Sequence, residues 1–233
     1  MNKYLKSTLV IVYYFIFNVI IYIPFIALDI NLNNIPDILF NIYTVSVEII
    51  FFVSLLYIYR KDFKFYIEDF KKNGKKYLKL GFNYWIIGLG VMLVSNILIG
   101  TFSPIALPEN EQIVREALKL SPFFIIFSTV LIAPIIEEML FRKTLFDIFK
   151  NKTIYIIVSG LIFGSFHIIG IGTSLYSWLY IIPYAALGMA FAYMMVKTNN
   201  ILTSICLHAF HNFITVLTIL LLLWGLQWRK NCI

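Results

Sequence analysis

The residues best suited to chemistry in this sequence are two adjacent carboxylates, Glu137 and Glu138, with Arg142 one helical turn later. They directly follow the uncharged run of residues 121–136. A charged side chain in a bilayer costs about 2.5–3.5 kcal/mol on insertion scales, so such groups persist mainly where they have a function or a partner. The sequence therefore predicts that other segments bring polar groups against this pair.

The spacing of these residues separates the two carboxylates. Residues four apart share one face of a helix, so Glu138 and Arg142 point the same way. Glu137 is rotated by about 100° from Glu138, because 3.6 residues make one turn. One carboxylate can therefore pair with the arginine while the other faces a water molecule. The same rule places His208 and Asn212 on one face.

The elements that must position these groups are membrane helices. The sequence is 61% hydrophobic and 13% charged, whereas an average soluble domain has about 25% charged residues. Residues 153–196 and 198–228 contain no Asp, Glu, Lys or Arg, and about 20 apolar residues are enough for a helix to cross a bilayer. The strands of a β-barrel would instead read as short alternating segments. We expect an all-α polytopic membrane protein with about seven, or eight, transmembrane helices of this length.

Polar or proline-containing turns separate the predicted spans. The basic segment 60–79 reads as a cytoplasmic loop that lies against lipid headgroups, and residues 109–119 read as a short mixed-charge helix at the surface. The span with the glutamate pair is expected to continue to Phe149, because no Pro or Gly follows Glu137 before that point. Pro183 is expected to kink a later span. The predicted spans are residues 7–28, 38–59, 83–102, 122–149, 153–170, 178–196 and 201–223.

The net charge of +7 indicates a lipid bilayer, and not nucleic acid, as the partner of the basic residues. Lysine and arginine gather in cytoplasmic loops, where they meet anionic lipid, and no soluble domain carries the charge here. Seven spans with the N-terminus in the cytoplasm place most of the basic residues on that side. Cys206 and Cys232 are too few to indicate a disulfide framework.

Three motifs in order, Glu137-Glu138-x-x-x-Arg142, Phe163-x-x-x-His167 and His208-x-x-x-Asn212, resemble the signature of the CPBP intramembrane proteases, also called the Abi family. That group includes the CAAX-processing endopeptidase and bacterial proteins linked to bacteriocin processing and self-immunity. The resemblance divides the chain into N-terminal helices with the basic loop, residues 1–119, and a four-helix catalytic core within residues 120–233. It implies an integral protein of the bacterial plasma membrane.

The resemblance also implies a role for each motif residue. Glu137 is the general base that activates a water, and His167 holds that water. His208 and Asn212 stabilise the oxyanion of the tetrahedral intermediate. The roles left for Glu138 and Arg142 are to orient the helix and to tune Glu137.

A metal is an open question at this point. Glu137, His167 and His208 are of the types that hold a catalytic Zn²⁺ ion, with three protein ligands and one open position. A metal-free glutamate mechanism would use the same residues. No cofactor is required by the motifs, and both versions stay open.

Some polar residues lie outside the motifs. Glu48 stands midway along an apolar span, where it could line a cavity or pair with a neighbouring helix. His211, three residues after His208, reads as a hydrogen-bonded core histidine. Neither is assigned to the catalytic set.

Two classes of function fit the sequence. The first is an intramembrane endopeptidase that acts on a hydrophobic or lipidated peptide, such as a CAAX-like protein. The second is a non-enzymatic membrane protein, either a bacteriocin self-immunity factor or a transporter, in which the same groups form a binding site or an ion relay. Nothing in the sequence indicates an oligomeric state.

Overall fold

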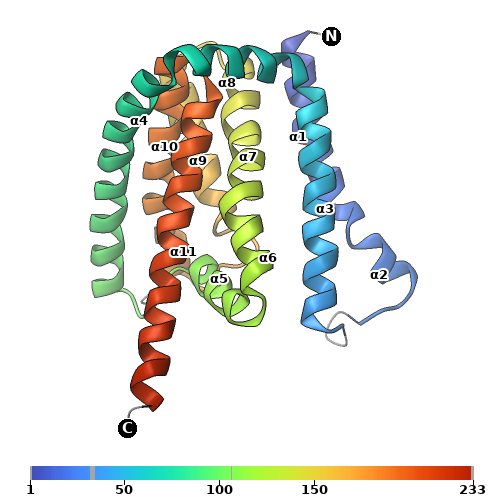
Figure 1. Ribbon diagram of the computed structural model, residues 1–233, viewed down its shortest axis with the longest axis vertical. Coiled ribbons are helices and arrows are strands. Elements are labelled where there is room, and N and C mark those ends of the chain that lie inside the picture. The colour runs from blue at the N-terminus through green and yellow to red at the C-terminus, as the bar shows by residue number, and fades with distance from the viewer. Residues whose placement is uncertain (1, 32–34, 106, 232–233) are drawn as a thin grey trace.

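The computed structural model describes residues 2–31, 35–105 and 107–231 and is a bundle of helices, most of which run along one direction (Figure 1). Cys232 lies outside this part of the chain. The all-α polytopic membrane fold is confirmed, because every regular element among the described residues is helical. The elements are α1 Lys3–Ile20, α2 Ile23–Ala27, α3 Asp37–Ile58, α4 Arg60–Phe102, α5 Glu109–Leu120, α6 Pro122–Phe127, η2 Ser128–Ile132, α7 Ala133–Glu138, η3 Met139–Thr144, α8 Leu145–Ile148, α9 Lys152–Phe166, η4 Leu175–Tyr180, α10 Ile181–Thr198 and α11 Ile201–Asn231.

Six helical segments in the described part of the chain are long and apolar enough to cross a membrane. The one remaining predicted span, residues 153–170, corresponds to α9, whose 15 residues are fewer than the roughly 20 of a straight crossing. With α9 included, the observed helices match the seven predicted spans one to one. The six long segments are Lys3–Ala27, Ile38–Ile58, Arg60–Phe102, Pro122–Ile148, Leu175–Thr198 and Ile201–Gly225.

The basic segment 60–79 is helical, and its prediction as a loop is wrong. It forms the first half of α4, a single helix of 43 residues. Lysine, glutamate and leucine are good helix formers, and no proline interrupts the segment. Figure 1 shows this half of α4 crossing one end of the bundle before the helix turns down its side. The predicted place at the membrane surface is compatible with this arrangement.

The helix with the glutamate pair is continuous from Pro122 to Ile148, as expected. It contains two wide turns, however, because η2 and η3 are π-helical. These wide turns stand directly before and after α7, which contains Glu137 and Glu138. π-Helical turns are rare and occur frequently at functional sites.

Close packing of α9 against α10 positions the second motif. A Cβ atom at Gly160 would lie 2.3 Å from Met189 Cγ, and one at Gly164 would lie 2.7 Å from the carbonyl oxygen of Ile181. These two glycines therefore allow α9 and α10 to pack closely. Pro183 produces no mid-helix kink, because it stands in the first turn of α10, where a proline leaves no hydrogen bond unmade.

A cluster of charges ties α1 and α4 to the end of the glutamate helix. Lys143 is 7% exposed and lies 2.7 Å from Asp147 and 3.2 Å from Asp62. Lys6 pairs with the other oxygen of Asp62 at 2.7 Å. Ser7 in α1 donates a hydrogen bond to Asp147. These contacts fix three segments that are far apart in the sequence.

Candidate active site

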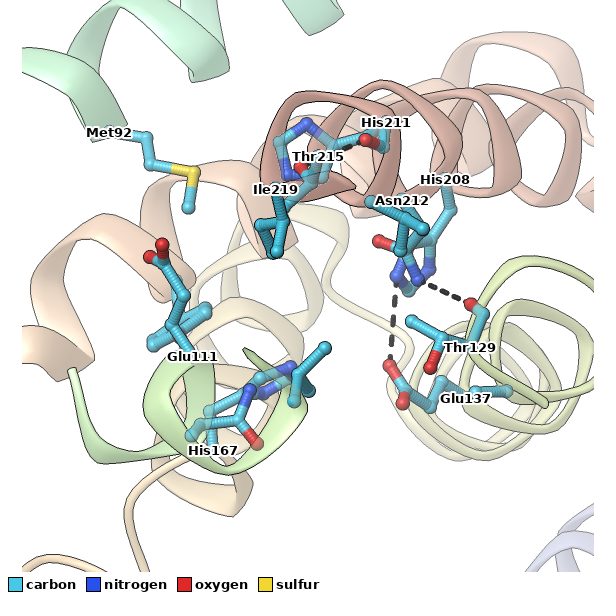
Figure 2. Close-up of a pocket in the computed structure, with 15 residues that line it drawn as sticks. Met92, Glu111, Thr129, Glu137, His167, His208, His211, Asn212, Thr215 and Ile219 are labelled. Atoms are coloured by element: carbon cyan, nitrogen blue, oxygen red, sulfur yellow. Dashed lines mark hydrogen bonds and ion pairs between the residues drawn. The ribbon is translucent and has the colours of Figure 1, made fainter. Parts of the chain in front are cut away.

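A cavity of about 260 Å³ contains members of all three motifs. Glu137 from α7, His167 at the end of α9, and His208 and Asn212 from α11 line it (Figure 2). Helix α5 closes another side with Asn110 and Glu111. The structure therefore brings together four of the six motif residues named for catalysis and places Glu138 and Arg142 behind them.

The two glutamates have separate environments, as their spacing predicts. The Glu138 side chain is fully buried, whereas that of Glu137 is 27% exposed. Arg142, also fully buried, has its Nε atom 3.2 Å from Glu138 Oε2. Its guanidinium carbon lies 4.4 Å from the centre of the Phe163 ring, a cation–π contact. Glu138 is thus paired inside the protein, and Glu137 is left to face the cavity.

His208 links the two carboxylates. Its Nδ1 atom is 3.0 Å from Glu138 Oε1, and its Nε2 atom is 3.7 Å from Glu137 Oε2. Because Glu138 is paired with Arg142 and accepts a hydrogen bond, Nδ1 of His208 carries the proton. The Nε2 atom of the same ring is turned toward Glu137. His208 is therefore held by the buried Glu138 and placed beside the cavity-facing Glu137.

His167 lies across the cavity from Glu137 (Figure 2). Its Nδ1 atom is 2.8 Å from the carbonyl oxygen of Phe163. A carbonyl oxygen can only accept, so Nδ1 of the neutral ring is the donor and Nε2 is an acceptor. The ring stacks on Tyr184, with a centroid distance of 4.4 Å. These contacts fix an imidazole that can accept a hydrogen bond from a water.

Asn212 is positioned by a hydrogen bond to a backbone carbonyl in the wide turn η2. The N–H of Ala133 bonds to the carbonyl of Ser128, five residues back. With the same spacing of five residues, the carbonyl of Thr129 would accept a hydrogen bond from the N–H of residue 134. Residue 134 is a proline and has no N–H. The free carbonyl of Thr129 accepts from Asn212 Nδ2 at 2.8 Å. The amide of Asn212 keeps one further N–H for a ligand.

Helix α5 is anchored beside the cavity through its first residue. Glu109 accepts hydrogen bonds from the hydroxyls of Thr173 and Ser177, in the segment that follows His167. Burial acts to raise the pKa of the Glu109 carboxyl, but the hydrogen bonds from Ser177 and Thr173 outweigh it and leave this pKa below its usual value. The anchor is therefore charged at neutral pH.

The three potential zinc ligands do not assemble into a metal site. Among the described residues, no group of three His, Cys, Asp or Glu side chains is arranged to hold a metal ion. Glu137 and His208 are in contact, but His167 stands on the far side of the cavity (Figure 2). The donor set does not fit the tetrahedral geometry of zinc, so no step below uses a metal.

Sequence reasoning missed several residues that line the cavity, among them two ionisable side chains and an amide. His211, which the sequence predicts to be a core residue, faces the cavity beside His208 (Figure 2). Its spacing of three from His208 was the available signal, because such residues lie partly on one face. Asn110 and Glu111 belong to a helix expected only at the surface. Their sequence carries no signal for the cavity, since it does not say what α5 covers.

Comparisons with known proteins agree with the motifs. Residues 119–214 match the family described as type II CAAX prenyl endopeptidase Rce1-like. No solved structure was found to match the chain significantly. The family match confirms the resemblance drawn from the three motifs.

The similar curated proteins are bacterial. YdiL of Bacillus subtilis, which is named as a proposed membrane peptidase, is 30% identical over 112 residues, 47% of this chain and 42% of YdiL. An uncharacterized protein of Mycoplasma capricolum is 29% identical over 204 residues, 82% of this chain and 58% of that protein. The UPF0177 protein YvdC of Lactococcus lactis is 27% identical over 144 residues, 59% of this chain and 52% of YvdC. The chain thus spans between 42% and 58% of the length of these relatives.

Proposed function

We propose that this chain, whose residues 119–214 match the type II CAAX prenyl endopeptidase Rce1-like family, is an intramembrane endopeptidase. One observation carries the proposal. Glu137 is exposed to a cavity in contact with His208, while the adjacent Glu138 is buried and paired. A partly desolvated carboxylate with an imidazole partner suits general-base catalysis. The substrate is a membrane-associated peptide with a hydrophobic or lipidated end, such as a CAAX-like protein.

The first step is attack by water on the peptide carbonyl carbon. Glu137 removes one proton from the water as its oxygen forms the new C–O bond. Nε2 of His167, the acceptor established by its bond to Phe163, receives a hydrogen bond from the other proton of that water. A bound and oriented water needs no covalent enzyme intermediate, and the fixed geometry supplies the advantage of proximity.

The oxyanion that forms is stabilised by two donors. These are the free N–H of Asn212 and, in the doubly protonated form of the ring, the N–H at Nε2 of His208, which Glu138 orients through Nδ1. When the C–N bond breaks, Glu137 returns its proton to the leaving amine. Loss of one such oxyanion donor typically lowers kcat by about 10²–10³-fold.

The cellular placement is part of the proposal. We place the protein in the bacterial plasma membrane with its N-terminus and the first half of α4 in the cytoplasm. All eight basic residues of segment 60–79 are exposed, which suits a surface that meets anionic lipid. We also propose that residues 1–119 form an N-terminal part and residues 120–233 the catalytic core. The start of the family match at residue 119 supports this division.

The direct test is cleavage by purified protein in proteoliposomes, with a library of membrane-anchored peptides and mass spectrometry of the products. Glu137→Gln keeps the shape of the side chain but cannot take a proton. We expect the cleavage rate to fall at least about 10³-fold, because the variant lacks both the general base and the carboxylate that contacts His208. His167→Ala is expected to abolish most cleavage too.

The matched control is Glu116→Gln. Glu116 is an exposed carboxylate of α5 that pairs with Lys119, and its variant should cleave at the wild-type rate. Chelator should leave the rate unchanged. If the wild type cleaves no peptide, or Glu137→Gln cleaves as well as wild type, the protease proposal fails in favour of a non-enzymatic immunity factor or transporter.

A further inference from the structure

A second cavity meets the active-site cavity at Glu137. It encloses about 330 Å³ between α1, α3 and the glutamate helix. Ala133 and Glu137 line both cavities. A chain bound across Glu137 can therefore place one part in each cavity. The second cavity is the natural place for a side chain that lies next to the scissile bond.

The second cavity holds a carboxylate that the mechanism does not use. Glu48 lies in its wall, roughly 15 Å from either end of α3 by the helical rise. Ser128 donates a hydrogen bond to Glu48 Oε2 at 2.5 Å. Within the described residues this is the one hydrogen bond of Glu48. The other oxygen remains available to a ligand inside the membrane, where an unpaired carboxylate is costly.

The rest of the wall suits a cation. Four aromatic side chains of α1 and α3 line the second cavity: Tyr14, Phe17, Tyr43 and Phe51. Aromatic faces attract ammonium and guanidinium groups. The apolar stem of a lysine or arginine also packs well on such surfaces while its charged end reaches a partner. A hydrocarbon tail would instead bury the free oxygen of Glu48 without a partner, which is unfavourable.

We infer that this second cavity binds a basic side chain of the substrate next to the scissile bond, with Glu48 as its counter-ion. The inference rests on the proposed protease function. Glu137 adds a second carboxylate to the wall, which strengthens the attraction for a cation while Glu48 supplies the fixed contact. Glu48 is a specificity residue and takes no part in the proton transfers.

The test compares peptide pairs that differ in a single residue. Membrane-anchored peptides carry lysine or its uncharged isostere norleucine, scanned over the three positions on each side of the mapped cleavage site. We expect the wild type in proteoliposomes to prefer lysine at one position by about tenfold in kcat/KM, mainly through KM, in line with a partly desolvated cation–aromatic and ion-pair contact. Glu48→Gln should bring that ratio close to one.

Two further variants separate charge recognition from helix packing. Ser128→Ala removes the hydrogen bond between Ser128 and Glu48 but keeps the carboxylate of Glu48, so this variant should retain the preference for lysine. Ser46→Ala is the matched control on α3, since Ser46 is exposed and two residues away on the opposite face. A preference that is absent in the wild type, or that persists in Glu48→Gln, overturns the inference.

A binding experiment distinguishes failure of this inference from failure of the protease proposal. Fluorescent lysine and norleucine peptides are titrated against the Glu137→Gln variant in nanodiscs. Tighter binding of the lysine peptide, lost when Glu48→Gln is added, supports the basic subsite even if the wild type cleaves nothing. Equal binding of the two peptides overturns the subsite even if the wild type is an active protease.

Discussion

At the scale of single residues, the Glu138–Arg142 pair has the largest expected effect on stability. Both side chains are fully buried, and the arginine also packs on Phe163. Removing one member of a buried ion pair leaves an uncompensated charge, whereas replacing both members leaves none. The pair therefore acts as a unit.

We predict that Arg142→Met destabilises the protein by about 3–5 kcal/mol, because Glu138 then stays buried without its counter-charge. The double variant Glu138→Gln/Arg142→Met should regain a substantial part of that loss. Thermal or denaturant unfolding in detergent micelles measures both. Equal stability of the single and double variants would contradict the coupling.

The residue scale also shows what spacing can predict. The different exposure of Glu137 and Glu138 followed from the rotation of about 100° between neighbours in a helix. The positions of His211 and Glu111 in the cavity wall did not follow, because spacing tells which residues share one helix face and not which helix covers that face. The place of Glu48 in a second cavity likewise depends on how α1, α3 and α7 pack.

At the scale of elements, α5 depends on the charge of Glu109 for its anchor to the segment after His167. The pKa of Glu109 is lower in the folded protein than its usual value. Its stabilising contribution is therefore fully present above the unfolded pKa, about 4.3, and is lost as the pH falls through the folded value. The anchor should hold at neutral pH and weaken in acid.

Hydrogen exchange can check this. We expect the amides of α5 to exchange faster, relative to intrinsic rates, as the pH falls below about 4, the range in which an ordinary glutamate protonates. Glu109→Gln should show raised exchange in α5 at neutral pH and little further change in acid. The same pH response in wild type and Glu109→Gln would rule out Glu109 as the titrating group.

Another element-scale prediction concerns the charge cluster around Lys143. Lys143→Met leaves Asp62 and Asp147 close together without their shared cation, so α1 and the start of α4 should loosen. Limited proteolysis or hydrogen exchange of α1 measures this. Lys150→Met is the control, because Lys150 is exposed and lies just beyond the end of the same helix. Equal protection of α1 in the two variants would show that the cluster does not hold α1 in place.

The error over α4 also belongs to the scale of elements. The positive charge of residues 60–79 predicts a place at the membrane surface, but charge does not distinguish a loop from a helix lying on lipid. The deciding properties were its seven lysines, which are good helix formers, the absence of proline, and continuity into the apolar second half of α4.

At the scale of the whole molecule, the exposed basic half of α4 predicts one orientation in the membrane. A cysteine at position 72, introduced as Lys72→Cys in a chain with Cys206→Ser and Cys232→Ser, should react with an impermeant thiol reagent in inside-out vesicles. It should stay unreacted in intact spheroplasts, because the positive-inside rule places this segment in the cytoplasm. Labelling from the outside would reverse the proposed topology.

The two wide turns around α7 have a mechanical consequence. Each holds one residue more than an α-turn, so the six residues of α7 have a rotational phase that neither flanking helix fixes alone. The rotation of α7 about the helix axis is therefore set by the two π-helical turns that flank it. A one-residue insertion or deletion in either π-helical turn can rotate Glu137 and Glu138 by about 100° about the helix axis while the ends of the helix stay in place. The number of residues in two short turns thus decides which glutamate faces the active-site cavity.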